Sequence, residues 1–428
     1  MMIKTMNRTR MMLAAAVAIA LVGCSRTAPP QFLVNLEGKP ESAVYPRTEE
    51  DRAKRQQLID GLTALFGTPD DPHLFPEAAT ALDIKKIKLA SGPVGGNADG
   101  TQRGLYRQHC VHCHGISGDG AGPTAVFLNP YPRDYRRGIY KFKATERAAK
   151  PRDEDLAHVI RMGVPGTAMP AFNLLAKDEI DALVEYVKYL SVRGETETLL
   201  SLAIDDFDKG DKLTRELLVE QLSSPTGMWA QAKNAVIATP TYPENNDQRF
   251  DIAAWDAAGL QNFYKDAYAL AQKKDPNTWH ALGEAVFRGG RAQCIKCHGP
   301  TALGDGSADD PIFDVWNEDK AKERKARQAA IAAGDKPPEK LYWTLPEQIS
   351  QPRNLRMGVY RGGRSPADLY RRIHAGVNGA SMPEGRTSLK PLEIWSVVDY
   401  IRTLPYDAMS KPGGTTPHST AAVARDRM

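Results

Sequence analysis

Two short strings of one form, Cys110-Val-His-Cys113-His114 and Cys294-Ile-Lys-Cys297-His298, constrain this chain more than any other feature. The C-x-x-C-H spacing is typical of covalent haem attachment, because two thiols add to the porphyrin vinyl groups and the adjacent imidazole binds the iron. A thioredoxin-like redox pair needs a βαβ context, and a zinc site needs further Cys or His nearby. The sequence shows neither context. It therefore predicts two c-type haems, attached through Cys110, Cys113, Cys294 and Cys297, with His114 and His298 as axial ligands.

The first 23 residues resemble a bacterial secretory signal. A basic start is followed by an apolar run over 11–22, which is too short for the about 20 residues that cross a bilayer. The run ends in Leu21-Val22-Gly23-Cys24, which resembles a lipobox, the site at which a Cys becomes lipidated. An ordinary signal peptide that ends near a Cys is the alternative. We expect an exported protein, lipid-anchored through Cys24 on the periplasmic or outer side of a bacterial membrane.

The charge of the chain is nearly balanced, with 56 basic and 52 acidic residues. Three of the basic residues lie in the predicted signal, so the mature protein is closer still to neutral. A protein that binds a polyanion through its overall charge needs a basic excess. The composition therefore predicts no nucleic-acid partner.

A series of landmarks occurs twice, which divides the chain into two similar units. The second copy contains an insertion at about 317–340, whose charged, Ala-rich composition indicates a surface helix. Each C-x-x-C-H string is followed by a Gly-Asp-Gly turn (118–120 and 304–306), a Pro-Arg pair (132–133 and 352–353), a Met-Pro loop (169–170 and 382–383) and an amphipathic segment (178–190 and 391–404).

These landmarks resemble the class I cytochrome c domain, and the resemblance covers about half of the chain. It implies an all-α fold with two such domains joined by a mostly helical connector. The predicted division is a lipoprotein signal peptide at 1–23, an N-terminal linker or extension at 24–97, cytochrome c domains at 98–194 and 278–406, a helical connector at 195–277 and a flexible tail at 407–428.

The sixth ligand of each iron decides between an electron carrier and a catalyst. Met169 and Met382 occupy matching positions, each with a Gly three residues before it and a Pro after it. Gly and Pro hold a chain in a tightly turned path, and a thioether favours the ferrous state. We therefore predict Met169 and Met382 as axial ligands. His158 and His374 are the alternatives, although they do not occupy equivalent positions.

The resemblance also implies partners for the groups around the iron. In the family, the ligating His donates to a Pro carbonyl, and Pro123 fits that role in the first domain, with Pro311 less certain in the second. Arg133 and Arg353 are candidate partners of the haem propionates. The basic residues that follow each haem string either dock acidic redox partners or are simply solvated.

The leading functional hypothesis is one-electron transfer by a membrane-anchored di-haem c-type cytochrome, a candidate subunit of a respiratory complex. On this hypothesis the protein is a carrier and not an enzyme, and its partners are other redox proteins. A di-haem cytochrome c peroxidase also has two C-x-x-C-H strings, but one of its haems must open its sixth position. A haem-based sensor or assembly factor, with 195–277 as the interaction module, is a third hypothesis.

Overall fold

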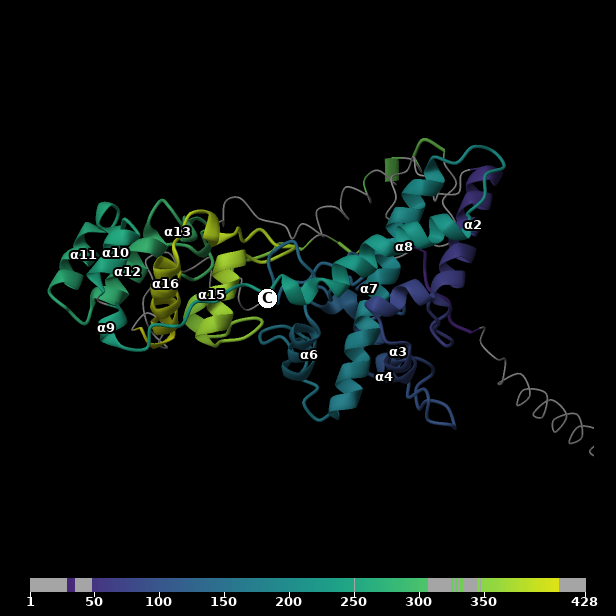
Figure 1. The fold of residues 1–428 in the computed structure, drawn as a ribbon, viewed down its shortest axis with the longest axis horizontal. Helices are drawn as coiled ribbons and strands as arrows, with labels where there is room; N and C mark the ends of the chain where they lie inside the picture. The colour runs from purple at the N-terminus through teal and green to yellow at the C-terminus, as the bar shows by residue number, and fades with distance from the viewer. Residues whose placement is uncertain are drawn as a thin grey trace, which may run out of the picture.

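The computed structural model describes residues 29–34, 48–249, 251–306, 325, 328–329, 332–334, 345–346 and 348–407. The predicted signal with Cys24, Pro311, most of the predicted insertion and the tail beyond 407 lie outside them. The described residues form helices and turns with two isolated β-bridges, so the predicted all-α class is confirmed. Figure 1 shows two lobes side by side, one built around α7 and the other around α16. No helix among the described residues has the length and apolar character needed to cross a membrane.

The α-helices of the first lobe are α2 (Glu49–Phe66), α3 (Ile84–Ala90), α4 (Leu105–His109), α5 (Val111–His114), α6 (Asp153–Met162), α7 (Lys177–Asp205) and α8 (Arg215–Ala230). Those of the second lobe are α9 (Asn246–Arg249), α10 (Ile252–Ala257), α11 (Lys265–Gln272), α12 (Thr278–Arg288), α13 (Cys294–His298), α15 (Pro366–Ala375) and α16 (Pro391–Thr403). Short 3₁₀ turns are η1 (Pro76–Thr80), η2 (Ala125–Phe127), η3 (Ala232–Asn234), η4 (Leu260–Asn262), η5 (Leu355–Met357), η6 (Gly385–Thr387) and η7 (Leu404–Tyr406).

Helix α7 is the centre of the first lobe, and α2, α3, α4, α6 and α8 pack against it. Its aromatic side chains form the contact surface. The ring centroid of Tyr186 lies 4.7 Å from that of Tyr106, and the ring centroid of Tyr189 lies 5.8 Å from that of Phe66. The Tyr189 hydroxyl also donates to the Phe66 carbonyl at 2.6 Å, which satisfies a buried polar group. These contacts fix the haem string, which follows α4, against α7.

The N-terminal extension is part of the first lobe, and is not only a linker. Thr48 caps α2 by accepting from the Asp51 amide at 3.0 Å, while the Asp51 carboxylate accepts from the Thr48 amide at 2.8 Å. The inner face of α2 is fully buried in the same core as α7. Further upstream, the Leu33 amide donates to the Ser117 hydroxyl at 2.6 Å. The extension therefore supports the turn that follows the first haem string.

The second lobe is centred on α16, which α12 crosses at close range. A methyl group built on Gly283 of α12 would lie 2.2 Å from the Ser396 carbonyl oxygen, so only glycine permits this crossing. Helices α10 and α11 complete the core, in which Trp255 is fully buried. The hydroxyl of Tyr264, at the start of α11, donates to the buried Glu393 carboxylate of α16 at 2.7 Å and connects these two helices.

The predicted connector does not form a separate unit. Its boundary at 194 falls inside α7, which continues without a break to Asp205. Its first helix, α8, packs on α7, whereas α10 and α11 belong to the second core. Between α8 and α10, the chain is held against the first lobe by two main-chain hydrogen bonds. The Glu146 amide donates to the Ala235 carbonyl at 2.8 Å, and the Ile237 amide donates to the Ala144 carbonyl at 2.9 Å.

Candidate haem sites

The first haem string lies where α4 ends and α5 begins. Cys110 has a φ of −121°, so it leaves helical geometry and separates the two helices. The His114 amide still donates to the Cys110 carbonyl at 2.8 Å, which keeps both cysteines and the histidine on one turn. Burial raises the pKa of the Cys110 thiol to about 12. The Cys113 sulfur lies 3.2 Å from the Thr124 hydroxyl, and all four motif cysteines are free of disulfides.

The His114 imidazole is buried and held in one orientation. Its Nδ1 lies 3.0 Å from the carbonyl oxygen of Arg133, and its ring stacks on Tyr135 with centroids 4.5 Å apart. A carbonyl only accepts hydrogen bonds, so Nδ1 bears the proton and Nε2 keeps its lone pair. Burial lowers the pKa of His114 to about 4, which keeps the ring neutral near pH 7. A neutral imidazole with a free Nε2 is the form that binds a metal ion.

The second string repeats this arrangement on α13. His298 Nδ1 lies 3.1 Å from the carbonyl oxygen of Arg353, and burial lowers the pKa of His298. Burial also raises the pKa of the Cys294 thiol to about 11. Two strings that lie 184 residues apart in sequence thus hold their imidazoles in the same way.

The predicted acceptor Pro123 is wrong. The histidines donate to the carbonyls of Arg133 and Arg353, which are the second residues of the two Pro-Arg pairs. The sequence marked these arginines by their repeat, but the prediction used their side chains and not their carbonyls. A main-chain role leaves no trace in side-chain chemistry, and only the matching position of the two pairs pointed to it.

The Gly-Asp-Gly turns at 118–120 and 304–306 are not equivalent in space. The Tyr135 amide donates to Gly118 at 2.7 Å, and the Leu355 amide donates to Ala302 at 2.9 Å. Ala302, with a φ of 61°, therefore takes the place of Gly118, whose φ is 72°. Gly118 and Ala302 each lie four residues after the motif histidine, so the two copies correspond at this point. The Gly-Asp-Gly of the second copy therefore lies two residues further along than that of the first.

The two Met-Pro loops share one backbone geometry. The Val164 amide donates to the Met169 carbonyl at 3.2 Å, and the Val377 amide donates to the Met382 carbonyl at 3.2 Å. Gly166 and Gly379 adopt φ values of 73° and 72°, which other residues rarely adopt. Both loops follow an amphipathic helix, α6 or α15. Ligation by Met169 and Met382 stays a prediction, and the matched loops support it.

The competing side chains lie elsewhere. His158 is exposed on α6, and His374 Nε2 faces the Glu146 carboxylate at 3.8 Å. Met162, Met228 and Met357 have exposed fractions of 56%, 44% and 57%. An exposed thioether has no fixed direction and is a poor candidate for an axial ligand.

The residues of both strings fit a c-type haem. Each string offers two thiols and a neutral imidazole on one turn, and the imidazole tautomer leaves Nε2 free. These are the donors that attach a porphyrin through two thioethers and bind iron from one face. Within the described residues, no cluster of three or more His, Cys, Asp or Glu side chains is placed to hold a metal ion.

Comparison with known proteins supports this assignment for the first domain. Residues 98–187 match the model of the family described as cytochrome c oxidase, cbb3-type, subunit III. Those residues form a cytochrome c domain. Such a domain binds haem c covalently and transfers electrons, so the predicted cofactor class is confirmed for this segment.

The other comparisons add no assignment. No curated protein matches the chain. Among solved structures, the reducing HAO-like protein complex of Kuenenia stuttgartiensis is similar at 20% identity and a TM-score of 0.42, over 70% of this chain and 94% of that chain. A TM-score this low does not establish a common fold.

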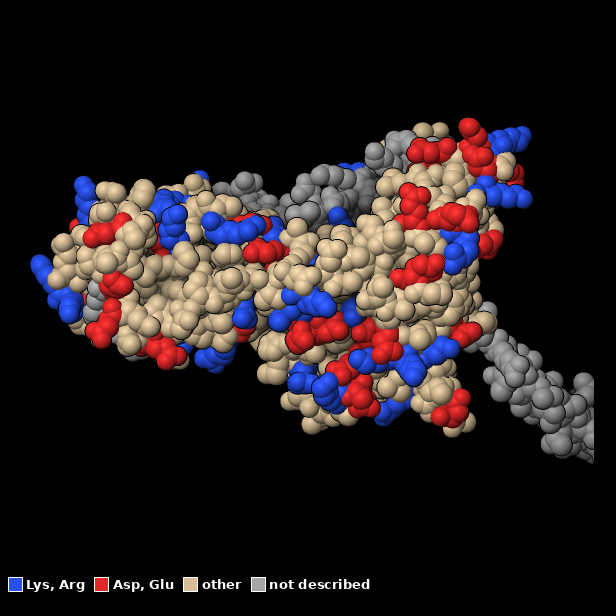
Figure 2. Space-filling view, in the orientation of Figure 1, with Lys and Arg blue, Asp and Glu red and all other residues tan. Residues whose placement is uncertain are grey.

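Two of the basic residues after the first string, Arg136 and Lys150, are buried, so they neither form an open docking face nor are simply solvated. Arg136 is 6% exposed and pairs with the buried Asp134 at 2.8 Å, and Lys150 pairs with Glu195. Figure 2 shows both signs of charge interspersed over the visible face of the molecule. Several of these cations, such as Lys143, Arg147, Arg371 and Arg372, instead line a cleft between the two domains, which was not predicted.

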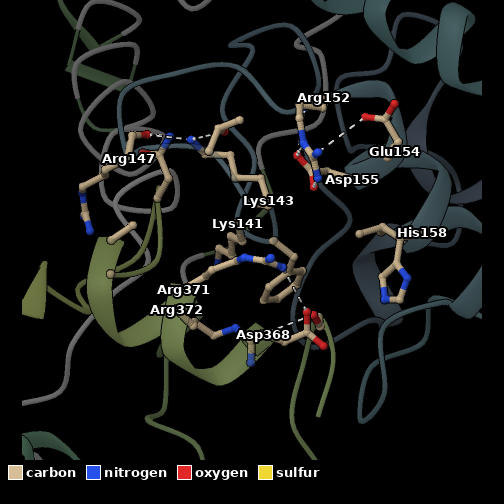
Figure 3. Close-up of a pocket in the computed structure, with 18 residues that line it drawn as sticks. Lys141, Lys143, Arg147, Arg152, Glu154, Asp155, His158, Asp368, Arg371 and Arg372 are labelled. Atoms are coloured by element: carbon tan, nitrogen blue, oxygen red, sulfur yellow. Dashed lines mark hydrogen bonds and ion pairs between the residues drawn. The ribbon is translucent and has the colours of Figure 1, made fainter. Parts of the chain in front are cut away.

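A cleft of about 220 Å³ separates α6 of the first domain from α15 of the second (Figure 3). Lys143 and Arg152 lie on its first-domain side, and Arg371 and Arg372 lie on its second-domain side. The Arg372 guanidinium donates to the carbonyls of Gly362 and Gly363 at 2.9 and 3.3 Å. Burial lowers its pKa to about 10. Main-chain carbonyls thus hold this cation, and the nearby Asp368 carboxylate partly offsets the effect of burial on its pKa.

Proposed function

We propose that the protein transfers single electrons through two covalently bound c-type haems. The observation that supports this most is the matched pair of imidazoles, each with its Nδ1 held by an arginine carbonyl at 3.0 or 3.1 Å. A haem c group supplies an iron that exchanges one electron when bound in such a site. Two equivalent sites in one chain favour relay between partners over chemistry at a single specialised centre.

The residues around each site suit this role. The Arg133 and Arg353 carbonyls fix the imidazole orientation and raise its basicity as a ligand. The Met169 and Met382 loops have the same backbone path, so both sites are proposed to have a thioether as second axial ligand. A site closed by His and Met changes oxidation state without gaining or losing a ligand, which suits a carrier.

We further propose that the mature chain is exported and lipid-anchored through Cys24, on the periplasmic or outer side of a bacterial membrane. The basic start, the short apolar run and the Leu-Val-Gly-Cys end support this proposal. Other redox proteins are the proposed partners, and membership of a respiratory complex is compatible with both the anchor and the haems.

The test of the cofactor is the intact mass of the mature protein from a host that matures c-type cytochromes. We expect two haem additions that survive extraction with acidified acetone. One addition would limit the function to the first domain, and none would refute the proposal.

The test of the carrier role is reactivity with small ligands. The ferrous protein is expected to bind little carbon monoxide and to reduce hydrogen peroxide slowly, while it reduces an oxidised partner cytochrome quickly. Fast peroxide turnover, with carbon monoxide binding at one haem, would favour the peroxidase alternative.

The test of the anchor is Cys24→Ser with Ser25→Ala as the matched control. The first variant is expected to leave the membrane fraction or to stall in processing, and the control to behave as the parent. Unchanged processing and membrane association of Cys24→Ser would contradict lipid anchoring.

A further inference from the structure

The segment 142–147 of the first domain lies against the second domain. A methyl group built on Gly362 would lie 2.5 Å from the Phe142 ring, and the Arg372 guanidinium lies 5.7 Å from that ring's centroid. The Glu146 carboxylate lies 3.8 Å from His374 and 3.2 Å from Arg386. The two domains are thus joined by packing and charge, and not by the covalent linker alone.

Arg147, at the end of this segment, reaches the Met382 loop. Its Nη1 donates to the Met382 carbonyl at 2.8 Å, and its Nη2 donates to the Ala380 carbonyl at 3.2 Å. A methyl group built on Gly376 would lie 2.5 Å from Arg147 Nη1, so the loop backbone and the guanidinium are in close contact. A planar fork that bonds two carbonyls at once fixes their relative position.

The first domain holds Arg147 in place for this contact. Lys143 Nζ donates to the carbonyls of Arg147 at 3.1 Å and Ala149 at 2.6 Å, which fixes the backbone on both sides. The neighbouring Glu146 amide is bonded to the Ala235 carbonyl at 2.8 Å. The backbone at Arg147 therefore has little conformational freedom to lose when the domains meet.

The loop that receives Arg147 has few bonds of its own. The Val377 amide donates to Met382 at 3.2 Å and the Ala380 amide donates to Val377 at 3.1 Å. The Met382 carbonyl therefore accepts from its own loop and from the other domain. We propose that Arg147 is a positioning residue that holds the Met382 loop from the other domain. Closure of the second haem site by Met382 then depends on docking of the first domain.

The second domain also contacts the Met169 loop of the first. Arg361 Nη2 of the second domain donates to Gly166 in the Met169 loop at 3.4 Å. A methyl group built on Gly166 would lie 2.4 Å from Arg353 Nη2, so Arg353 also touches this loop. Each Met loop is therefore contacted by arginines of the other domain.

The first test is hydrogen exchange in the full-length holoprotein. In Arg147→Ala, the amides of Val377 and Ala380 are expected to exchange about tenfold faster, because two charge-assisted bonds to their loop are lost. Arg147→Lys keeps the charge but not the fork, and is expected to give a smaller increase. Arg161→Ala removes an exposed arginine of the same domain and serves as the matched control. Unchanged exchange at both amides in Arg147→Ala would overturn the proposal.

The second test follows the ligand itself. In a Met169→His background, the sulfur-to-iron absorption band reports Met382 alone. Adding Arg147→Ala is expected to weaken that band and to lower the midpoint potential of the second haem, while α16 amides keep their protection. A band and potential identical to those of the Met169→His background would overturn the proposal.

This inference rests on the proposed ligation by Met382, and the two can fail separately. If Met382→Ala leaves the band intact, the ligand assignment is wrong. If Met382→Ala removes the band but Arg147→Ala changes neither exchange nor potential, the ligand stands and the positioning role is wrong.

Discussion

The two haem units share their ligand geometry but differ in what surrounds it. Next to His114, the first domain has Asp134 and Tyr135, both buried. The matching positions in the second domain are Asn354 and Leu355. The first site is thus enclosed by an ion pair and a stacked ring, whereas the second has an amide and an aliphatic side chain.

The arginine that follows each site shows the consequence. Arg136 pairs with Asp134 at 2.8 Å, and both side chains are almost completely buried. Arg356, its counterpart, is also buried but pairs with Asp407 at 3.4 Å, whose side chain is 43% exposed. The second domain places its counter-charge at the surface, and its Met loop is held by Arg147 from the first domain. We conclude that the buried arginine of the first site has its counter-charge inside the core, whereas that of the second site has it at the surface.

The largest expected effect separates the two sites completely. Cys113→Ser is expected to weaken or abolish haem attachment in the first domain only, and Cys297→Ser in the second only, because each string attaches its own porphyrin. Mass spectrometry of peptides that contain each string measures this. Loss of both haems from either variant would contradict independent attachment.

The next effect concerns the buried ion pair. Asp134→Asn is expected to destabilise the first domain by about 3 kcal/mol, because the buried Arg136 would lose the carboxylate that binds its guanidinium at 2.8 Å. Asn354→Asp, the reverse change at the matching position, is expected to alter the second domain by no more than about 1 kcal/mol. Native-state hydrogen exchange of α7 and α16 gives both values. Equal effects in the two domains would show that the buried ion pair does not distinguish the two sites.

The smallest effect concerns the turn after each string. Gly118→Ala is expected to cost the first domain about 1–2 kcal/mol, since its φ is 72° and the new methyl group would lie 3.0 Å from Leu190 and Tyr135. Ala302→Gly relieves the same backbone strain in the second domain and is expected to stabilise it by up to about 1 kcal/mol. Thermal unfolding of each variant measures the change. A destabilised Ala302→Gly would show that burial of the methyl group outweighs the strain.

The haem strings, the repeat and the all-α class were predictable, because each depends on local chemistry or on a pattern within the sequence. The domain limits were not. Helix α7 continues past 194, and α2 and α10 join the cores, because apolar faces pack on whatever surface the fold brings near. The acceptor of the His114 hydrogen bond was not predicted, because every residue has a main-chain carbonyl and the sequence does not mark which one accepts.

The sequence predicted that basic residues cluster after each haem string, but not what their side chains contact. A basic segment indicates a solvent-exposed surface only when no other domain packs against it. Here a second domain lies opposite, and the Arg147 fork bonds main-chain carbonyls of residues more than 200 positions away in sequence. Nothing in a single sequence marks such a pairing.

We propose that the two haem sites are each closed by a histidine and a methionine. The most direct measurement is the sulfur-to-iron absorption band of the ferric protein in Met169→Ala, Met382→Ala and the double variant. We expect each single variant to lose about half of the band, because one haem of two loses its thioether, and the double variant to lose all of it. A full band in either single variant, with both haems attached, would contradict the claim for that site.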